Sequence, residues 1–460
     1  MKKILAIILL TSLSLFAQNP LKIYEKNSLD SNIIAKISNN RGMNTLRCRG
    51  ADRYNNVWCK VHYRNNDFDI KGWSRKKSLD ILASKPQKTF ERRFGGRYSD
   101  IGKALIVLED GFLIGGSTQS FGRGQFDAYI IKTDPYGNQL WQTTLGGNRD
   151  DSLEDIIAVK NGYIFTGSTQ SFGNHMQSLY VGRITHDGFR EWQKGYFLDD
   201  DDRYMGKSIA KINDTHVMIA GYEDKIKFFN SFVNCQLNAV DVNEGHRWSR
   251  KYGGNQPDKA NSIIRLKDGY LFAGFTDSWG KGLLDMYVVK VDDDGKRVWH
   301  RTFGYDYNEV ANQIIATKDG GFIAVGTTES NHVSAKDVYV VKMDADGKLQ
   351  WQGVYGHEDD EEGFGIIEVN GGYVIAGYTK STKQYDSQVY IMKINQKGRR
   401  VWERTYGGIH EDRAYAIAKT TDGMILTGFS KSGPQRGKDL YLLKLDENGN
   451  FFDGEKVFLE

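Results

Sequence analysis

A tryptophan-containing motif that returns about every fifty residues dominates the chain from about residue 85 onward. Its successive tryptophans lie 51, 56, 51, 52 and 51 residues apart, at Trp141, Trp192, Trp248, Trp299, Trp351 and Trp402. A sequence period of this size indicates a β-propeller or another repeat array, in which each repeat is one supersecondary unit. Propellers serve as enzymes, scaffolds and binding platforms with the same strands, so the period constrains the architecture far more than the activity.

Each of the seven repeats divides into four strands. In the fifth repeat these are EVANQIIAT, GGFIAVGTT, DVYVVKMD and KLQWQGVYG, in order from the inner to the outer strand. The third strands are rich in β-branched and aromatic residues, as strands buried on both faces are. A recurring glycine in the second strand indicates close backbone packing; it is Gly116, Gly167, Gly221, Gly274, Gly326, Gly377 and Gly428. The sequence therefore predicts an all-β chain with a seven-bladed propeller of four-stranded blades at residues 86–460.

Outer-strand candidates outnumber the other strands by one. They begin near Phe90, at the six tryptophans and near Asp453, whereas the first three strands occur in seven copies. The segment KTFERRFGG keeps the aromatic residue and both glycines, but FFDGEKVF has Asp453 in the tryptophan position. We therefore predict that residues 88–95 complete the last blade, which would protect its edge from pairing with other molecules. The C-terminal strand would then add outside or stay loose.

The first residues, MKKILAIILLTSLSLFAQ, place two lysines before an apolar stretch and the small residue Ala17 before Gln18. This pattern predicts a cleaved signal peptide at residues 1–17 and a periplasmic or secreted protein. No later segment is long and apolar enough to span a bilayer. The formal net charge of +4 gives no indication of nucleic-acid binding.

The three cysteines are unevenly placed. Cys48 and Cys59 lie near the N-terminus in what would be an oxidising compartment, whereas Cys235 stands alone in the repeat region. This arrangement favours a disulfide between Cys48 and Cys59. Two unpaired buried thiols are the alternative, because spacing does not show whether the side chains come within bonding distance.

Residues 20–82 resemble a bacterial SH3 domain. The resemblance rests on LKIYEKNSLDSNIIAKI, on WCKVHY and on the closing KGWSRKKSL, where Gly72 and Trp73 match the family's Gly-Trp-Val ending. Ser74 departs from the apolar residue that usually follows this tryptophan. Members of this family often bind cell-wall peptides or other envelope components, so the resemblance implies an anchoring module with an envelope partner. A small barrel that only packs on the propeller is the alternative.

The repeats resemble WD40/quinoprotein-like propellers. WERTYGG at 402–408 has the Trp-x-x-x-aromatic-Gly-Gly start, and KDGGFIAVG at 318–326 has the Asp-Gly-Gly second-strand entry. Quinoprotein enzymes are typically eight-bladed and many carry an adjacent cysteine pair, which this chain lacks. The resemblance therefore implies the non-catalytic relatives, such as outer-membrane assembly factors, as the closer analogy.

One acidic position recurs just before each inner strand. It is occupied by Asp100, Asp151, Asp202, Asp258, Glu309, Glu361 and Asp412. Pseudo-symmetry would place these carboxylates around one mouth of the central channel, where they would suit a cation or a basic partner. Alternatively, each would accept backbone N–H bonds in its own loop. The turns between third and outer strands that contain Asp-Gly, at 294–295 and 346–347, are not calcium loops, because Lys290 and Lys342 stand where the first carboxylate ligand is needed.

The third repeat deviates most, because it is longer than the others. Its third strand has Gln236 and Ala239 in place of the tyrosine and the lysine that this strand usually carries, as in DVYVVKMD. A loop altered for binding and a tolerated insertion both explain this. Loop aromatics elsewhere, at Phe121, Phe172 and Trp279, would either stack on sugars or cap blade edges.

No catalytic motif, metal-ligand spacing or phosphate loop is present in the sequence. Our leading hypothesis is a non-enzymatic, exported and monomeric envelope protein without a cofactor, whose SH3-like module anchors it and whose propeller binds a protein or a glycan. The runner-up is a metal-dependent, lactonase-like hydrolase at the channel mouth. An enzyme of that kind would gather His357, His410, Glu361 and Asp412 around one pocket, whereas a binding platform would leave them dispersed.

Overall fold

A computed structural model describes residues 89–451, apart from 174–175, 198–201, 228–229, 333–334, 383–385 and 434–436, together with the backbone of five strands near the N-terminus. The chain divides into two units, Met1–Gln87 and Lys88–Glu460, and each is considered by itself. The signal peptide that we predict lies outside the described residues. Within the described part of the chain, no helix is long and apolar enough to cross a bilayer.

The first unit contains one five-stranded antiparallel sheet in the order β2-β1-β5-β4-β3. Its strands are β1 (Leu21–Tyr24), β2 (Ile33–Ile37), β3 (Met43–Ala51), β4 (Val57–Arg64) and β5 (Asp69–Arg75). The register places Cys48 of β3 directly opposite Cys59 of β4. The side chains of this unit are not among the described ones, so the SH3 resemblance and the disulfide stay predictions.

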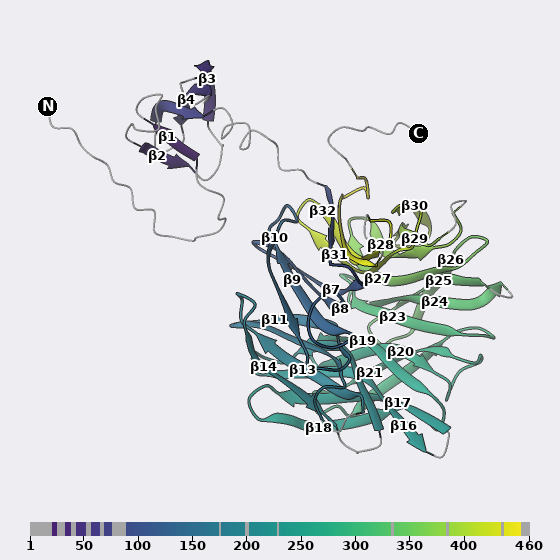
Figure 1. Ribbon diagram of the computed structural model, residues 1–460. Coiled ribbons are helices and arrows are strands. Elements are labelled where there is room, and N and C mark those ends of the chain that lie inside the picture. Colours follow the sequence, from purple (N-terminus) through teal and green to yellow (C-terminus); the bar gives the residue numbers. More distant parts are fainter. Residues whose placement is uncertain are drawn as a thin grey trace. The chain divides into compact units, whose positions relative to one another are not determined.

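The second unit is an all-β propeller of seven four-stranded blades, as the sequence predicts (Figure 1). Its inner strands are β7 (Asp100–Leu108), β11 (Asp151–Val159), β15 (Asp202–Lys211), β19 (Asp258–Leu266), β23 (Glu309–Ala316), β27 (Glu361–Val369) and β31 (Asp412–Thr420). The second strands are β8 (Gly111–Thr118), β12 (Gly162–Thr169), β16 (His216–Lys227), β20 (Gly269–Thr276), β24 (Phe322–His332), β28 (Gly372–Thr379) and β32 (Gly423–Ser430). The third strands are β9 (Asp127–Thr133), β13 (Ser178–Ile184), β17 (Asn230–Asp241), β21 (Asp285–Val291), β25 (Ala335–Met343), β29 (Gln388–Asn395) and β33 (Asp439–Asp446). The outer strands are β10 (Gln139–Leu145), β14 (Arg190–Tyr196), β18 (Gly245–Tyr252), β22 (Arg297–Phe303), β26 (Leu349–Tyr355), β30 (Arg400–Tyr406) and, for the last blade, β6 (Phe90–Phe94).

The hydrophobic core lies between the blades. Second and third strands are buried along nearly their whole length, which explains their uninterrupted β-branched and aromatic sequences. Each apolar cluster joins residues of two neighbouring blades, as where Ile323 of β24 and Ile375 of β28 share one cluster. The recurring second-strand glycines have the packing role that we expect. A Cβ on Gly326 would collide with the carbonyl group of Val310 on the inner strand.

The first strand of the propeller closes its last blade. Strand β6 pairs with β33 in antiparallel register, from Leu440 opposite Phe94 to Lys444 opposite Phe90. The ring of Phe90 is 1% exposed and faces Gly137, in the way that Trp141 faces Gly188 of the following blade. Phe90 thus takes the place of the missing tryptophan. The predicted closure by residues 88–95 is confirmed, whereas residues 452–460 lie outside the described part of the chain.

Candidate binding site at the channel mouth

The seven recurring carboxylates occupy equivalent positions at the start of the inner strands, and none is more than 4% exposed. Asp151 shows their common surroundings. Its Oδ2 accepts the Gly147 N–H at 2.8 Å and the Ser171 hydroxyl at 2.6 Å, and Oδ1 accepts the Thr169 hydroxyl. A backbone N–H four residues earlier and a serine hydroxyl twenty residues later also bind Asp100, Asp258 and Asp412. Such bonds stabilise a buried carboxylate and tie each inner strand to its own blade.

The two glutamates of the ring keep the same pattern. Glu309 accepts the Tyr305 N–H at 2.7 Å, and Glu361 accepts the His357 N–H at 2.6 Å. In the third blade, Lys225 replaces the threonine opposite Asp202, and its Nζ lies 3.2 Å from Oδ2. The extra residues of this repeat lengthen the hairpin of β16 and β17, whose pairing continues to Lys227. Binding of a cation or a basic partner by the seven carboxylates stays a prediction.

A second row of buried carboxylates begins the third strands and was missed by our sequence analysis. Asp127 and Asp151 both approach Gly146, and Asp285 and Glu309 both approach Gly304. Burial raises the pKa of Asp127, and the neighbouring Asp151 raises it further. The sequence signal was present as an aspartate two residues before the third-strand tyrosine in FDAYIIK, LDMYVVK, KDVYVVK and KDLYLLK.

The two channel-mouth histidines do not meet. His357 Nε2 lies 3.2 Å from a carboxylate oxygen of Glu403, and His410 Nδ1 lies 3.7 Å from one of Asp386. Among the residues that the structure describes, no three His, Cys, Asp or Glu side chains are grouped so that they could hold a metal ion. This arrangement gives the hydrolase hypothesis no catalytic centre within the described ranges.

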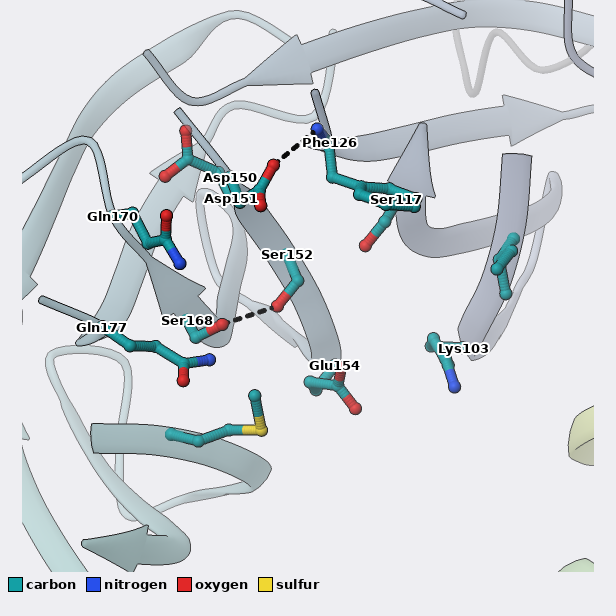
Figure 2. A pocket seen from close by; sticks show the side chains of 12 residues that line it. Lys103, Ser117, Phe126, Asp150, Asp151, Ser152, Glu154, Ser168, Gln170 and Gln177 are labelled. Atoms are coloured by element: carbon teal, nitrogen blue, oxygen red, sulfur yellow. Dashed lines mark hydrogen bonds between the residues drawn. The ribbon is translucent and has the colours of Figure 1, made fainter. Parts of the chain in front are cut away.

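A cavity of about 330 Å³ opens where the inner strands of blades 1 and 2 lie side by side (Figure 2). Along β7 and β11, buried residues alternate with half-buried ones, so successive side chains point into the blades and into the cavity in turn. Lys103 and Glu154 supply charged groups to the cavity, while Gln170 and Gln177 supply side-chain amides. Phe126 adds an aromatic ring. The arrangement combines the hydrogen-bonding groups and the apolar surface that ligand pockets need.

Hydroxyl groups and one further carboxylate complete the polar lining. Ser152 Oγ and Ser168 Oγ are 2.9 Å apart, and Ser117 lines the same cavity. Asp150 accepts the Phe126 N–H at 3.2 Å and also lines the cavity (Figure 2). These groups offer both donors and acceptors to a ligand.

Cations around the channel lie over aromatic rings. The distances from the cationic group to the ring centroid are 3.9 Å for Lys103 on Tyr415, 3.9 Å for Arg413 on Tyr378, 4.0 Å for Lys438 on Phe429 and 4.2 Å for Lys259 on Tyr222. A ring face attracts a cation and shields it from water. The first of these pairs joins blades that are distant in the sequence, since Lys103 belongs to blade 1 and Tyr415 to blade 7.

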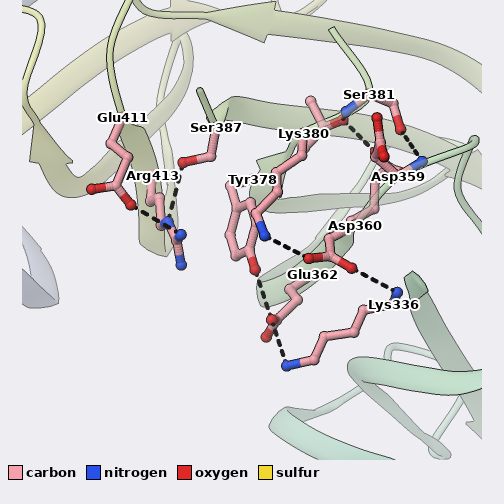
Figure 3. A network of polar contacts seen from close by, with 12 residues as sticks. Lys336, Asp359, Asp360, Glu362, Tyr378, Lys380, Ser381, Ser387, Glu411 and Arg413 are labelled. Atoms are coloured by element: carbon pink, nitrogen blue, oxygen red, sulfur yellow. Dashed lines mark hydrogen bonds and ion pairs between the residues drawn. The ribbon is translucent and has the colours of Figure 1, made fainter. Parts of the chain in front are cut away.

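The sixth repeat carries a run of five acidic residues at 358–362, and two of them, Asp360 and Glu362, are neutralised locally (Figure 3). Asp360 binds Lys380 Nζ at 2.6 Å and the backbone N–H of Lys336 at 3.1 Å. Glu362 binds Lys336 Nζ at 3.0 Å and accepts the Tyr378 hydroxyl at 2.7 Å. This run is therefore part of a salt-bridge network between blades 5 and 6.

The charge balance at Lys103 differs from that of the acidic run. Burial lowers the pKa of Lys103, and the nearby cations Lys207, Lys438 and Arg413 lower it further, against the opposing effect of Glu154. The carboxylate of Glu154 is already paired with Lys207. Cations of blades 3 and 7 thus act electrostatically on Lys103 of blade 1.

The loop aromatics that we considered for sugar stacking pack against the blades. Phe121 lies 5.6 Å from Tyr129 and Trp279 lies 5.6 Å from Tyr287, measured between ring centroids. Both are half-buried members of the clusters between the blades. This geometry matches the edge-capping alternative.

No protein-family model and no curated protein matches this chain. Among solved structures, the acylaminoacyl peptidase of Pyrococcus horikoshii is similar at 11% identity and a TM-score of 0.42, covering 77% of this chain and 51% of the peptidase. Sqt1 from Chaetomium thermophilum is similar at 9% identity and a TM-score of 0.42, covering 74% of this chain and 82% of Sqt1. This chain spans about half the length of the peptidase. Likenesses at such identities concern the fold alone.

Proposed function

We propose that this chain is a non-enzymatic binding protein whose propeller presents the cavity between blades 1 and 2 to a partner. The observation that carries this proposal is the cavity itself, with its cationic and amide side chains and its half-buried Phe126. A binding platform needs only a surface of this kind on a rigid scaffold, and the closed ring of blades supplies the rigidity.

We further propose that the chain is exported and that its N-terminal unit holds it at the cell envelope. The apolar stretch after Lys2 and Lys3 and the two cysteines on adjacent strands support this proposal. The mature chain would then act in the periplasm or outside the cell. N-terminal sequencing of the protein recovered from expressing cells tests it, because cleavage after Ala17 would leave Gln18 as the first residue. An intact Met1 in all cell fractions would contradict export.

The binding role is tested by blocking the cavity. The full chain is immobilised and exposed to fractionated envelope polymers and envelope proteins, beside the variant Gln177→Trp. The Gln177 side chain lines the cavity, so the larger indole should fill it and abolish retention of the partner. The matched control is Gln139→Trp, which adds the same indole at an exposed outer-strand position. Equal retention by both variants would contradict a role for this cavity.

A further inference from the structure

We propose that the cavity between blades 1 and 2 binds a sugar that carries a carboxylate, as one unit of an acidic glycan. This inference rests on the proposed binding function and names the class of ligand at that same site. The carboxylate would pair with the Lys103 ammonium, and the sugar hydroxyls would bind the opposite end of the cavity.

The charges around Lys103 call for an anion. Among the described residues, no carboxylate lies within ion-pair distance of the Lys103 ammonium, and the nearby Glu154 is paired with Lys207. Glu411 is likewise shared by Arg413 at 3.1 Å and Lys438 at 3.3 Å. Like charges held together away from water are unfavourable, and an incoming carboxylate would relieve this repulsion. Burial is the main cause that lowers the pKa of Lys103, and the nearby cations lower it further.

The opposite end of the cavity has groups that suit hydroxyls. Gln170, Gln177 and Asp150 gather there, away from Lys103 (Figure 2). Within the described part of the chain, the side-chain amides of both glutamines lack a hydrogen-bond partner, so each offers a donor and an acceptor. Asp150 adds a carboxylate that accepts hydroxyl donors. A ligand that was only a simple anion would leave these groups unused.

The shape and size of the site favour a sugar ring. The aromatic ring of Phe126 provides an apolar surface for the C–H face of a pyranose. The volume of about 330 Å³ lies at the lower end of the range for small-molecule pockets, which fits one or two sugar units. An extended peptide with a carboxylate is the alternative ligand, and a glutamate trimer distinguishes it in the experiment below.

Calorimetric titration of the full chain tests the inference. The probes are trimers of galacturonic, glucuronic and mannuronic acid, each beside the neutral trimer with the same linkage and the carboxylate replaced by a hydroxymethyl group. We expect at least one acidic trimer to bind and its neutral counterpart to bind at least about tenfold more weakly, since a charge-assisted hydrogen bond is lost. The variant Lys103→Met should bind the acidic trimer at least about tenfold more weakly than the parent chain does, whereas Lys103→Arg should retain most of the affinity.

Lys259→Met is the matched control. Lys259 also lies over an aromatic ring in the channel, but it does not line the cavity, so this variant should bind like the parent chain. Equal binding of acidic and neutral trimers, equal losses for both lysine variants, or binding by none of the acidic trimers would overturn the inference. Equal affinity for a glutamate trimer would instead assign the site to protein carboxylates. In those cases, if the parent chain retains an envelope component that the Gln177→Trp variant does not retain, the proposed function stands while this inference fails.

Discussion

The carboxylate of Asp155 in blade 2 accepts the backbone N–H of Ile209 in blade 3 at 2.9 Å, so one side chain joins the inner strands of two blades. The same relationship recurs in the next three blades. Ser208 accepts the N–H of Ile263, Ser262 that of Ile314, and Gln313 that of Ile366. At the corresponding positions, blades 6, 7 and 1 have Gly365, Ala416 and Ala104, which have no side-chain acceptor. Side-chain acceptors therefore bond neighbouring inner strands from blade 2 to blade 6, whereas within the described ranges the inner strands from blade 6 through blades 7 and 1 to blade 2 lack this bond.

Asp155 should make folding stability depend on pH. Burial raises its pKa to about 6, against 3.8 for an unperturbed aspartate. Because the folded-state value is the higher one, the folded protein binds the proton more tightly. The stabilising contribution is therefore full below about pH 4 and is lost as the pH rises through about 6, by on the order of 3 kcal/mol. Denaturant unfolding of the parent chain and Asp155→Asn between pH 4 and 8 checks this. The variant should have the flatter profile, and two parallel profiles would contradict the assignment.

Removing the side chain of Phe90 should destabilise the closure of the propeller. Phe90 is 1% exposed and packs 6.1 Å from Phe112, so Phe90→Ala should cost about 3 to 5 kcal/mol of unfolding free energy. Phe189→Ala is the matched control, because Phe189 is 72% exposed. Equal denaturation midpoints for the two variants would refute a closing role for β6.

A methyl group on a second-strand glycine should be poorly tolerated. In Gly326→Ala the new Cβ meets the Val310 carbonyl, and backbone on both strands must move, with an expected loss of at least about 2 kcal/mol. Gly320→Ala is the comparison, since a Cβ there meets nothing within 4 Å and only its positive φ of 82° is unfavourable. That change should cost about 1 kcal/mol. Thermal unfolding of both variants checks this prediction. A loss for Gly320→Ala as large as that for Gly326→Ala would contradict the packing role of Gly326.

The seven buried carboxylates should not need a metal ion for stability. N–H and hydroxyl groups already bind both oxygens of Asp151 and the Oδ2 of Asp412, although in the described part of the chain Oδ1 of Asp412 is buried without a hydrogen-bond partner. We therefore expect the melting temperature of the full chain to be the same with calcium, with zinc and with a chelator. A fall of several degrees on chelation, together with measured bound metal, would restore the acidic ring as an ion site.

Thiol alkylation should distinguish the three cysteines. Cys235 is fully buried, and burial raises the pKa of its thiol, so it should not react in the folded chain. If Cys48 and Cys59 are bonded, the unfolded chain should expose one reactive thiol without reductant and three with it. Three reactive thiols in the absence of reductant, in protein recovered from an oxidising compartment, would exclude the disulfide.

The sequence by itself determined the number of blades, the four strands of each and the closure by Phe90. The recurrence of the motif gives the number of blades. The buried strands and the strand glycine are recognised from residues within a single repeat. The position of the seven carboxylates was also readable. Their burial was not, because it depends partly on a second aspartate, such as Asp127 beside Asp151, that approaches only after neighbouring blades have packed.

Only the tertiary structure decided where the candidate site lies. Lys103 and Tyr415 are 312 positions apart in the sequence, yet they are in contact because the ring closes and brings blade 7 beside blade 1. No repeat pattern contains this pair, since the channel-facing positions of the inner strands differ from blade to blade. Packing fixes the buried positions of every repeat in the same way, whereas the positions that face the channel are free to differ and can carry the specificity of binding.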